Sequence, residues 1–510
     1  MKRIDVKNKN LRIFKGIAYS FSLITCLSCA DLENDPTEFN IPPQSFATTE
    51  GIETAVTGLY ERLRNASQWT TFYAPAWAGD DITTFKGGNK ADFREFDQRN
   101  VDATNGRLLN NFRDLYSLIK NVNSVLDRVS DVSSIPEIDQ DRADVLMGEA
   151  YFLRGLAFHH LARVHGRIPI DLSVSSSGPQ PLPSQETVYG QIESDFLEAE
   201  SRLPEIYPNV LAGAPRPNKG SARALLARLY MDWAGFPLKD ESKYVQAASS
   251  AKQVIDNKDA HGFDLLENVS DLWLVANKFN KESVYTISYA SGLGLANLKY
   301  GILGLPGGTD FRGWDETYAE IRYFEDFPEG PRKEATYRTE IGWETFPNQQ
   351  SPVFAKVAGP KDDIDVGQFR TDRNDFYIRY AEVLLIYAEA SARSNNANPE
   401  AWEALNKIRR RAEGLPFETP DSSIDVTSGD LADLVVTERK WEFAGEYLRW
   451  YDLIRLELVQ EALSNRDPRV SEGPEGTLLN EPNPIIGSLG TENYFSPLPA
   501  AILEEVPSLK

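Results

Sequence analysis

The chain has 510 residues, of which 41% are hydrophobic and 25% are charged, so its composition is that of a folded protein with a large core and excludes a disordered chain or a multi-span membrane protein. Its 76 acidic residues exceed its 54 basic ones, and the net charge of −22 argues against a nucleic-acid-binding protein, which needs a basic face for phosphate groups. Two cysteines and four histidines leave little material for a disulfide framework, a structural zinc site or a Cys–His catalytic pair.

The first residues of the chain have the pattern of a bacterial secretion signal. Residues 1–15 contain six basic side chains and one acidic side chain, and residues 17–27 form an apolar run that is too short to span a bilayer. The run ends at Ser28 and Cys29, and a small residue directly before a cysteine at this place resembles the lipobox of bacterial lipoproteins. We therefore expect residues 1–28 to be removed and the thiol of Cys29 to carry a lipid anchor. The alternative, a redox or metal-binding pair of the two cysteines, lacks partner ligands in this segment.

Most of the remaining chain shows the apolar spacing of helices. Apolar and small residues recur at three- and four-residue intervals in residues 49–64, 107–129, 141–165, 184–203, 219–233, 243–257, 376–394, 399–412 and 430–463. Ser184 and Asn398 stand where N-caps are expected, and Pro399 follows Asn398 as a first helical residue. Small residues on one helix are expected to accept large residues from the next, as in tetratricopeptide-like hairpins. The predicted fold class is all-α, with tetratricopeptide-like helical repeats of irregular spacing.

Two stretches interrupt the helical pattern. Residues 67–99 contain seven aromatic side chains, and residues 291–371 contain twelve aromatic residues together with 11 glycines and 6 prolines. A segment so rich in Gly and Pro cannot continue a helical stack. Long structured loops on a rigid framework usually carry function. We therefore expect a long loop-rich insertion, with room for minor β-structure.

Five blocks of the sequence have a distinctive pattern. They are Cys29-Ala30-Asp31-Leu32 with Pro36, GEAYFLRG at 148–155, IRYAEVLLIYAEA at 378–390, ERKWEFA at 438–444 with RWYDLIR at 449–455, and Pro497-Leu498-Pro499 with Pro507. These blocks resemble the SusD/RagB family of Bacteroidetes outer-membrane lipoproteins. The resemblance covers nearly the whole chain, although Ala500 and Ile502 depart from the family pattern in the last block. It divides the chain into a signal peptide (1–28), an N-terminal helical region (29–290), a loop-rich excursion (291–371) and a C-terminal helical region (372–510).

The resemblance implies a glycan-binding protein that is not an enzyme. Such a protein lies at the cell surface, lipid-anchored in the outer membrane, where it captures oligo- or polysaccharides and passes them to a SusC-like TonB-dependent transporter. No cofactor, metal or nucleic acid is expected. The charged residues of the motif blocks are expected to form ion pairs within the helical body, because buried charges need partners. These residues are Arg379, Glu382, Glu389, Glu438, Arg439, Glu442, Arg449 and Asp452.

The two irregular stretches contain the side chains that sugar binding requires. Sugars offer an apolar face and a rim of hydroxyl groups, so they are bound by flat aromatic rings together with forked polar groups. The candidate glycan-binding residues are Trp69, Tyr73, Trp77, Asp81, Asn89 and Arg94 from the first stretch and Tyr300, Trp314, Tyr318 and Trp343 from the second. We expect the two stretches to meet on one face and form a sugar cradle. The alternative for each aromatic residue is that it packs beneath its own loop.

Other functions fit the sequence less well. Asp80 and Asp81 have the composition of a glycosidase carboxylate pair, but adjacent residues rarely point the same way. His159, His160 and His165 do not share a helix face well, which weakens a metal site. A peptide- or protein-binding tetratricopeptide-like scaffold remains as an alternative, and the tryptophans in the loops argue against it. The identity of the glycan is not encoded in any recognisable motif.

Overall fold

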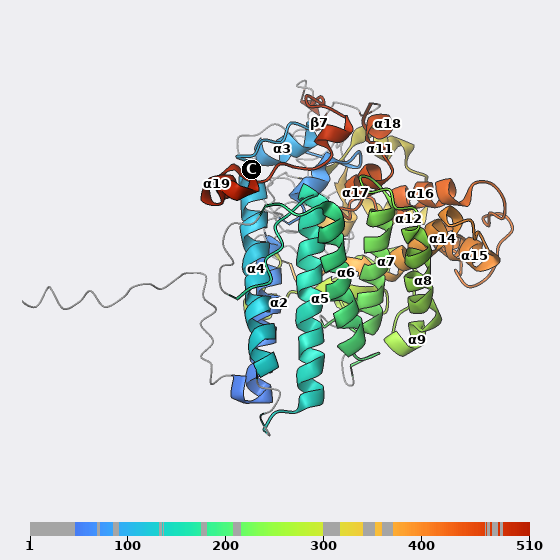
Figure 1. The fold of residues 1–510 in the computed structure, drawn as a ribbon. Helices are drawn as coiled ribbons and strands as arrows, with labels where there is room; N and C mark the ends of the chain where they lie inside the picture. The colour runs from blue at the N-terminus through green and yellow to red at the C-terminus, as the bar shows by residue number, and fades with distance from the viewer. Residues whose placement is uncertain are drawn as a thin grey trace, which may run out of the picture. The chain divides into compact units, whose positions relative to one another are not determined.

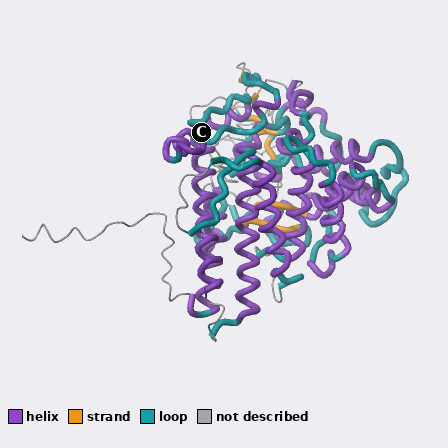
Figure 2. Tube along the Cα trace, viewed as in Figure 1, coloured by secondary structure: helices purple, strands orange, loops and turns teal. Residues whose placement is uncertain are grey.

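The structure is a computed structural model that describes residues 46–68, 72–84, 91–131, 135, 137–174, 181–207, 216–298, 317–339, 352–359, 371–464, 466, 470–471, 478–479 and 483–510. All of these residues belong to one compact unit. Their secondary structure is mostly helical, and their strands occur only as two-stranded pairs (Figure 2). The predicted all-α class is therefore confirmed. In the part of the chain that is described, no helix combines the length and apolarity needed to cross a bilayer.

Long helices pack side by side in chain order and form the frame of the molecule (Figure 1). The first group is α2 (Thr49–Ala66), α4 (Gly106–Asp131), α5 (Gln140–His165), α6 (Gln185–Arg202), α7 (Lys219–Ala234) and α8 (Lys243–Asp256), followed by the short α9 (Lys258–His261). The second group is α14 (Tyr380–Arg393), α15 (Pro399–Ala412) and α16 (Leu431–Glu442). Three short helices, α17 (Arg449–Arg455), α18 (Val459–Ser464) and α19 (Ala500–Glu505), follow in the chain. Helix α14 packs on α8, so the two groups form a continuous stack.

Local sequence signals explain where several helices begin. The Ser184 hydroxyl accepts a hydrogen bond from the Thr187 N–H at 3.1 Å, which caps α6 as expected. Asn398 caps α15 by accepting from the Ala401 N–H at 2.9 Å, and Pro399 occupies the first helical position. Caps of this kind satisfy N–H groups that have no partner within the helix.

Close packing between α5 and α6 depends on glycine. A Cβ atom at Gly155 of α5 would lie 2.8 Å from Cε1 of Phe196 on α6. A small residue on one helix therefore accepts a large ring from its neighbour, as the sequence pattern predicted. This contact brings α5 and α6 into the close antiparallel arrangement of a helical hairpin.

Two predicted helices differ from the structure. Residues 376–379 were expected to begin a helix, but they belong to strand β6 (Asp375–Arg379), which pairs antiparallel with β2 (Ser283–Ile287). The segment 430–463 was expected to be one helix, but it is divided into α16, α17 and α18. The break falls at Gly445, where φ is +73° and a Cβ atom would lie 2.3 Å from the ring of Phe354. Only glycine fits this conformation and this approach without strain.

The remaining elements are short, and many of them lie within the two irregular stretches. They are η3 (Ala74–Ala78), β1 (Ile82–Thr83), α3 (Ala91–Asp97), η5 (Val269–Trp273), η6 (Val275–Asn277), η7 (Ser291–Leu293), β3 (Tyr318–Ala319), α11 (Ile321–Asp326), α12 (Pro331–Thr336), β4 (Tyr337–Arg338), β5 (Val353–Phe354), α13 (Ala355–Ala358), β7 (Val470–Ser471), β8 (Leu478–Leu479), η9 (Thr491–Asn493) and η10 (Pro507–Leu509). Strand β4 pairs with β5, and β7 pairs with β8.

Charged residues of the sequence blocks form a buried set of ion pairs. The pairs are Arg379 with Glu282 (2.8 Å) and Glu442 (2.7 Å), Glu382 with Arg228 (2.5 Å), Glu389 with Arg455 (2.7 Å), Glu438 with Arg332, Arg439 with Asp452 (2.9 Å) and Arg449 with Asp80 (2.7 Å). All eight residues that were expected to pair do so. Removing one partner of such a buried pair typically costs about 3–5 kcal/mol, because it leaves an uncompensated charge.

Candidate functional site

The two irregular stretches meet through strands β1 and β3. Ile82 lies opposite Ala319 and Thr83 opposite Tyr318 in an antiparallel pair. The pairing continues where the Glu320 N–H donates to the carbonyl oxygen of Asp81 at 3.1 Å. The expectation that residues 67–99 and 291–371 come together is therefore confirmed for their described parts.

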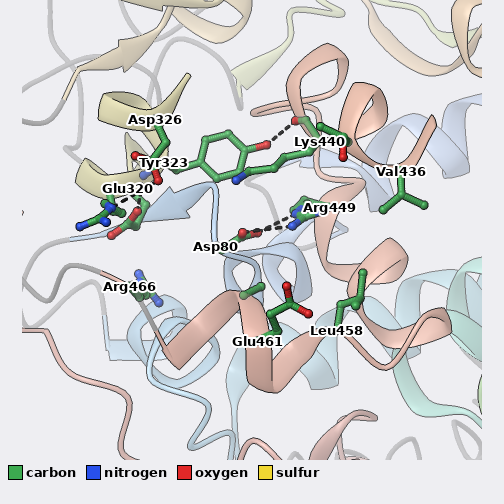
Figure 3. Close-up of a pocket in the computed structure, with 13 residues that line it drawn as sticks. Asp80, Glu320, Tyr323, Asp326, Val436, Lys440, Arg449, Leu458, Glu461 and Arg466 are labelled. Atoms are coloured by element: carbon green, nitrogen blue, oxygen red, sulfur yellow. Dashed lines mark hydrogen bonds and ion pairs between the residues drawn. The ribbon is translucent and has the colours of Figure 1, made fainter. Parts of the chain in front are cut away.

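A cavity of about 300 Å³ lies beside this meeting point, and we call it the junction cavity (Figure 3). It is lined by Asp80 before β1, by Glu320, Arg322, Tyr323 and Asp326 at α11, by Val436, Thr437 and Lys440 on α16, by Arg449 on α17, by Leu458, Glu461 and Ala462 at α18, and by Arg466. Both irregular stretches and the C-terminal helices thus contribute side chains. The lining contains four acidic and four basic residues, so its formal charges balance.

Asp80 is held ionised on one side of the junction cavity. Arg449 binds it through two parallel hydrogen bonds, Nε to Oδ1 at 2.7 Å and Nη2 to Oδ2 at 3.2 Å (Figure 3). Burial alone would raise the pKa of Asp80, but the charge and hydrogen bonds of Arg449 outweigh it, and the net pKa is lowered. This bidentate pair fixes both side chains in a single geometry.

Asp81 points away from the junction cavity although it is the next residue. Its carboxylate accepts a hydrogen bond from the Gly445 N–H at 2.9 Å, and it is not among the cavity's lining residues. Burial raises the pKa of Asp81 to about 7, and the nearby negative charge of Asp80 acts in the same direction. The two carboxylates therefore do not flank a common ligand position, which is what a glycosidase pair requires.

Tyr323 and Lys440 form the opposite side of the junction cavity (Figure 3). The Tyr323 hydroxyl donates a hydrogen bond to the carbonyl oxygen of Lys440. The backbone N–H of Tyr323 donates to the Glu320 carboxylate at 2.7 Å, and this hydrogen bond caps α11. The Lys440 ammonium lies 4.9 Å from the centre of the Tyr323 ring. Among the described residues no carboxylate lies within 4 Å of this ammonium. It is therefore a cation available to a ligand that enters the cavity.

The structure buries three of the predicted glycan-binding residues. Trp77 is 0% exposed and packs on Phe93, with ring centres 4.8 Å apart. Asp81 and Tyr318 are each 1% exposed. Sugar contact is therefore corrected to interior packing for these three residues, because a side chain without exposed surface cannot meet a ligand.

The other predicted contacts fall into two groups. Tyr73 and Arg94 are half-buried in the first stretch, and Tyr73 packs on Tyr447 with ring centres 4.6 Å apart. The remaining candidates lie outside the described residues, as does the expected lipidation site. They are Trp69, Asn89, Tyr300, Trp314, Trp343 and Cys29.

Sequence reasoning singled out Asp80 but missed most of the other side chains that line the junction cavity. Lys440 and Arg449 belong to a block that was interpreted as structural, and Tyr323 was one of many aromatic residues in the second stretch. The only sequence signal for the site was the accumulation of aromatic and polar residues in two separate stretches. That signal indicates a region, and the lining depends on tertiary packing.

The three clustered histidines have separate structural partners. His159 lies 2.8 Å from the Asp232 carboxylate, and His165 lies 3.1 Å from the carbonyl oxygen of Ser496. His160 stacks on Phe72 with ring centres 3.6 Å apart. Burial lowers the pKa of all three imidazoles. Within the described ranges, no group of three or more His, Cys, Asp or Glu side chains has the arrangement of a metal site.

Comparison with known proteins identifies the family. A model of the SusD family matches residues 345–509, and a second model, described as starch-binding and associating with the outer membrane, matches residues 31–231. SusD-like protein P2 of Formosa agariphila is 27% identical to this chain over 95% of its length and 96% of the relative. The chain belongs to the SusD/RagB family.

Solved structures share the fold. A SusD homolog from Bacteroides thetaiotaomicron is 22% identical and aligns with a TM-score of 0.74 over 91% of this chain and 96% of the other. A laminarin-binding SusD-like protein is 22% identical and aligns with a TM-score of 0.70 over 90% and 97% of the two chains. At this level of identity the likeness concerns the fold alone.

Proposed function

We propose that this protein captures oligosaccharides at the cell surface and passes them to a SusC-like TonB-dependent transporter. The observation that carries the proposal is the junction cavity, where two stretches far apart in sequence converge on a set of fixed polar side chains. Membership of the SusD/RagB family supports it, as does the fold shared with a laminarin-binding protein. The lipid on Cys29, the position in the outer membrane and the transporter partner are part of the proposal.

The side chains of the junction cavity suit a polyhydroxylated ligand. Lys440 supplies hydrogen-bond donors, and the Glu461 carboxylate supplies acceptors on the opposite side. The Asp80–Arg449 pair holds its charges in place, so the ligand does not have to order these groups on binding. Flat platforms for sugar rings are proposed to come from Trp69, Trp314 and the other candidate aromatics outside the described residues.

We infer binding without hydrolysis. A glycosidase needs one carboxyl group that can donate a proton and a second that faces it across the scissile bond. Arg449 keeps Asp80 ionised, and Asp81 is turned toward the backbone of Gly445. The Asp80–Asp81 pair therefore does not have the arrangement of a glycosidase pair. Together with the match to the SusD family, this leads us to expect that purified protein releases no reducing sugar from polysaccharide.

Affinity electrophoresis against a panel of neutral and acidic polysaccharides tests the proposal. We expect at least one polysaccharide to retard the protein. Lys440→Gln should weaken binding about tenfold or more, since a hydrogen bond from a charged group contributes about 1.5–3 kcal/mol. Lys407→Gln, on a partly exposed face of α15 and outside the cavity lining, removes the same charge and should leave binding unchanged. Absence of retardation by every polysaccharide would overturn the proposed function.

A further inference from the structure

A second cavity, of about 410 Å³, lies between α2 and strand β2, and we call it the α2–β2 cavity. It shares no lining residue with the junction cavity. Its volume is within the range of small-ligand sites, about 300–1,000 Å³. One face of α2 contributes Thr57, Tyr60, Glu61 and Arg64, which follow the three- and four-residue spacing of a single helix stripe. The other side is the continuous run from Tyr285 to Ala290, with Leu295, Lys278, Phe279 and Arg216.

The lining of the α2–β2 cavity has a net positive charge, although the whole chain has a net negative charge. Its lining contains three basic residues, Arg64, Arg216 and Lys278, and only one acidic residue, Glu61. The whole chain has a net charge of −22, and the lining of the junction cavity is balanced. An anionic ligand is therefore better matched here than in the junction cavity.

The three cations differ in their availability. Arg216 is neutralised by Glu149 at 2.6 Å and Glu53 at 3.1 Å. Among the described residues, the only carboxylate within 4 Å of the Arg64 guanidinium is that of the mostly exposed Glu61, at 3.3 Å. Lys278 donates to the carbonyl oxygen of Tyr289 at 3.0 Å, and no described carboxylate lies within 4 Å of its ammonium. Lys278 is thus the cation with charge left to offer a ligand.

Aromatic rings stand beside these cations. Tyr60 and Phe279 are half-buried residues that line the cavity. The Arg216 guanidinium lies 5.8 Å from the centre of the Tyr60 ring, and the Lys278 ammonium lies 5.6 Å from that of Phe279. A ring with an apolar face and a carboxylate substituent complements this combination of rings and positive charge.

We propose that the α2–β2 cavity binds acidic sugars, with the carboxylate of a uronate residue paired to Lys278. This inference rests on the proposed saccharide capture and adds a second site with its own ligand class. The carboxylate meets the ammonium of Lys278, and the apolar face of the sugar ring lies against Phe279 or Tyr60. The partly exposed Arg64 adds positive charge from the α2 side of the cavity.

Calorimetric titration with tri-galacturonate and with its methyl ester, which has the same rings without the charge, tests the proposal. We expect the acid to bind at least tenfold more tightly than the ester. Lys278→Gln should remove most of that difference. Lys281→Gln, three residues away and outside the lining, removes the same charge and should preserve it.

Equal binding of acid and ester, or an undiminished preference in Lys278→Gln, would overturn the acidic-sugar site. A protein that binds neutral glycans but no galacturonate would contradict this site and leave the proposed function intact. A protein that binds no saccharide of either kind would contradict both.

Discussion

The pKa values of two adjacent aspartates, Asp80 and Asp81, are shifted in opposite directions in this protein. Asp80 faces Arg449 and has a lowered pKa, whereas Asp81 faces a backbone N–H and has a pKa raised to about 7. The difference arises from their partners, because Arg449 binds both carboxylate oxygens of Asp80 whereas Asp81 accepts only from the Gly445 N–H among the hydrogen bonds given for its carboxylate. The groups near Asp81 are Asp80, Arg449 and the phenols of Tyr323, Tyr337 and Tyr447. None of the three phenols compensates a charge on Asp81.

Replacement of Asp81 should reveal this buried carboxyl group in the pH dependence of stability. The pKa of Asp81 rises from 3.8 in the unfolded chain to about 7 in the folded one. The stabilisation that the protonated Asp81 gives the folded state is therefore fully present below about pH 4 and is lost as the pH rises to 7. Asp81→Asn cannot ionise. Its free energy of unfolding relative to wild type should therefore increase between pH 4 and 7, by on the order of 3 kcal/mol, and level off above. Urea titrations at several pH values measure this, and a pH-independent difference would contradict the assignment.

Pairing of charges could be predicted from the sequence more reliably than exposure of aromatic rings. Arg379 and Glu442 occur in blocks that supply both signs, and a buried charge without a partner is too costly to persist. Trp77 carries no such constraint, since an indole is stable either in a core or on a surface. Its burial against Phe93 follows from the fold of two distant segments, which residue type does not specify.

At the scale of elements, the approach of α5 to α6 depends on a missing side chain. Gly155→Ala would place a Cβ atom 2.8 Å from the Phe196 ring, so one of the two helices must shift. Overpacking of this kind costs about 1–3 kcal/mol, more than the helix propensity that alanine adds, about 1 kcal/mol. We expect a net loss of stability on thermal or urea unfolding.

Gly190 of α6 provides the matched control. A Cβ atom there would have no heavy atom within 4 Å. Gly190→Ala should therefore stabilise the protein by about 0.5–1 kcal/mol through helix propensity alone. Equal stabilisation by both substitutions would show that the two helices are not held in close contact at Gly155.

Elements with strong local signals were predicted well, and those set by distant partners were not. Helix α15 matches its predicted limits, because Asn398 and Pro399 mark its start. The residues that become β6 have a helix-compatible pattern, and they form a strand because β2, almost 100 residues earlier, offers a pairing edge. Likewise the two-residue strands β1 and β3 exist only where their stretches meet, so the site they position could be predicted as a region but not as a list of residues.

At the scale of the whole molecule, one buried charge cluster connects separate parts of the chain. Glu442 at the end of α16 binds Arg379 of β6 and Arg411 of α15, each at 2.7 Å, and Arg332 of α12 at 3.2 Å. Glu282, just before β2, binds the first two arginines as well. The cluster therefore ties the loop-rich excursion and the β2–β6 pair to the C-terminal helices that line the junction cavity.

Protonation of this cluster should set the acid limit of stability. Burial alone would raise the pKa of Glu442, but the surrounding Arg411, Arg379 and Arg332 outweigh it and hold the pKa well below its ordinary value. The pKa values of Glu382 and Asp452 are lowered by their own arginine partners in the same way. Their stabilisation is full above the unfolded carboxylate pKa, near 4, and is lost as the pH falls through the folded values. We expect the melting temperature to decline steeply below about pH 4.

Glu442→Gln tests whether the cluster supplies that stability. The substitution leaves one guanidinium uncompensated in the interior and should cost about 3–5 kcal/mol at pH 7. The deficit should shrink as the pH falls below 4, because Glu442 of the unfolded wild-type chain is then protonated and the advantage of the low folded-state pKa declines. Glu418→Gln breaks the exposed pair with Lys407 and should cost no more than about 1 kcal/mol at either pH. Chemical denaturation at pH 7 and pH 3 measures both variants, and a Glu442→Gln deficit as small as that of the surface control would mean that the packed helices hold the molecule together without this cluster.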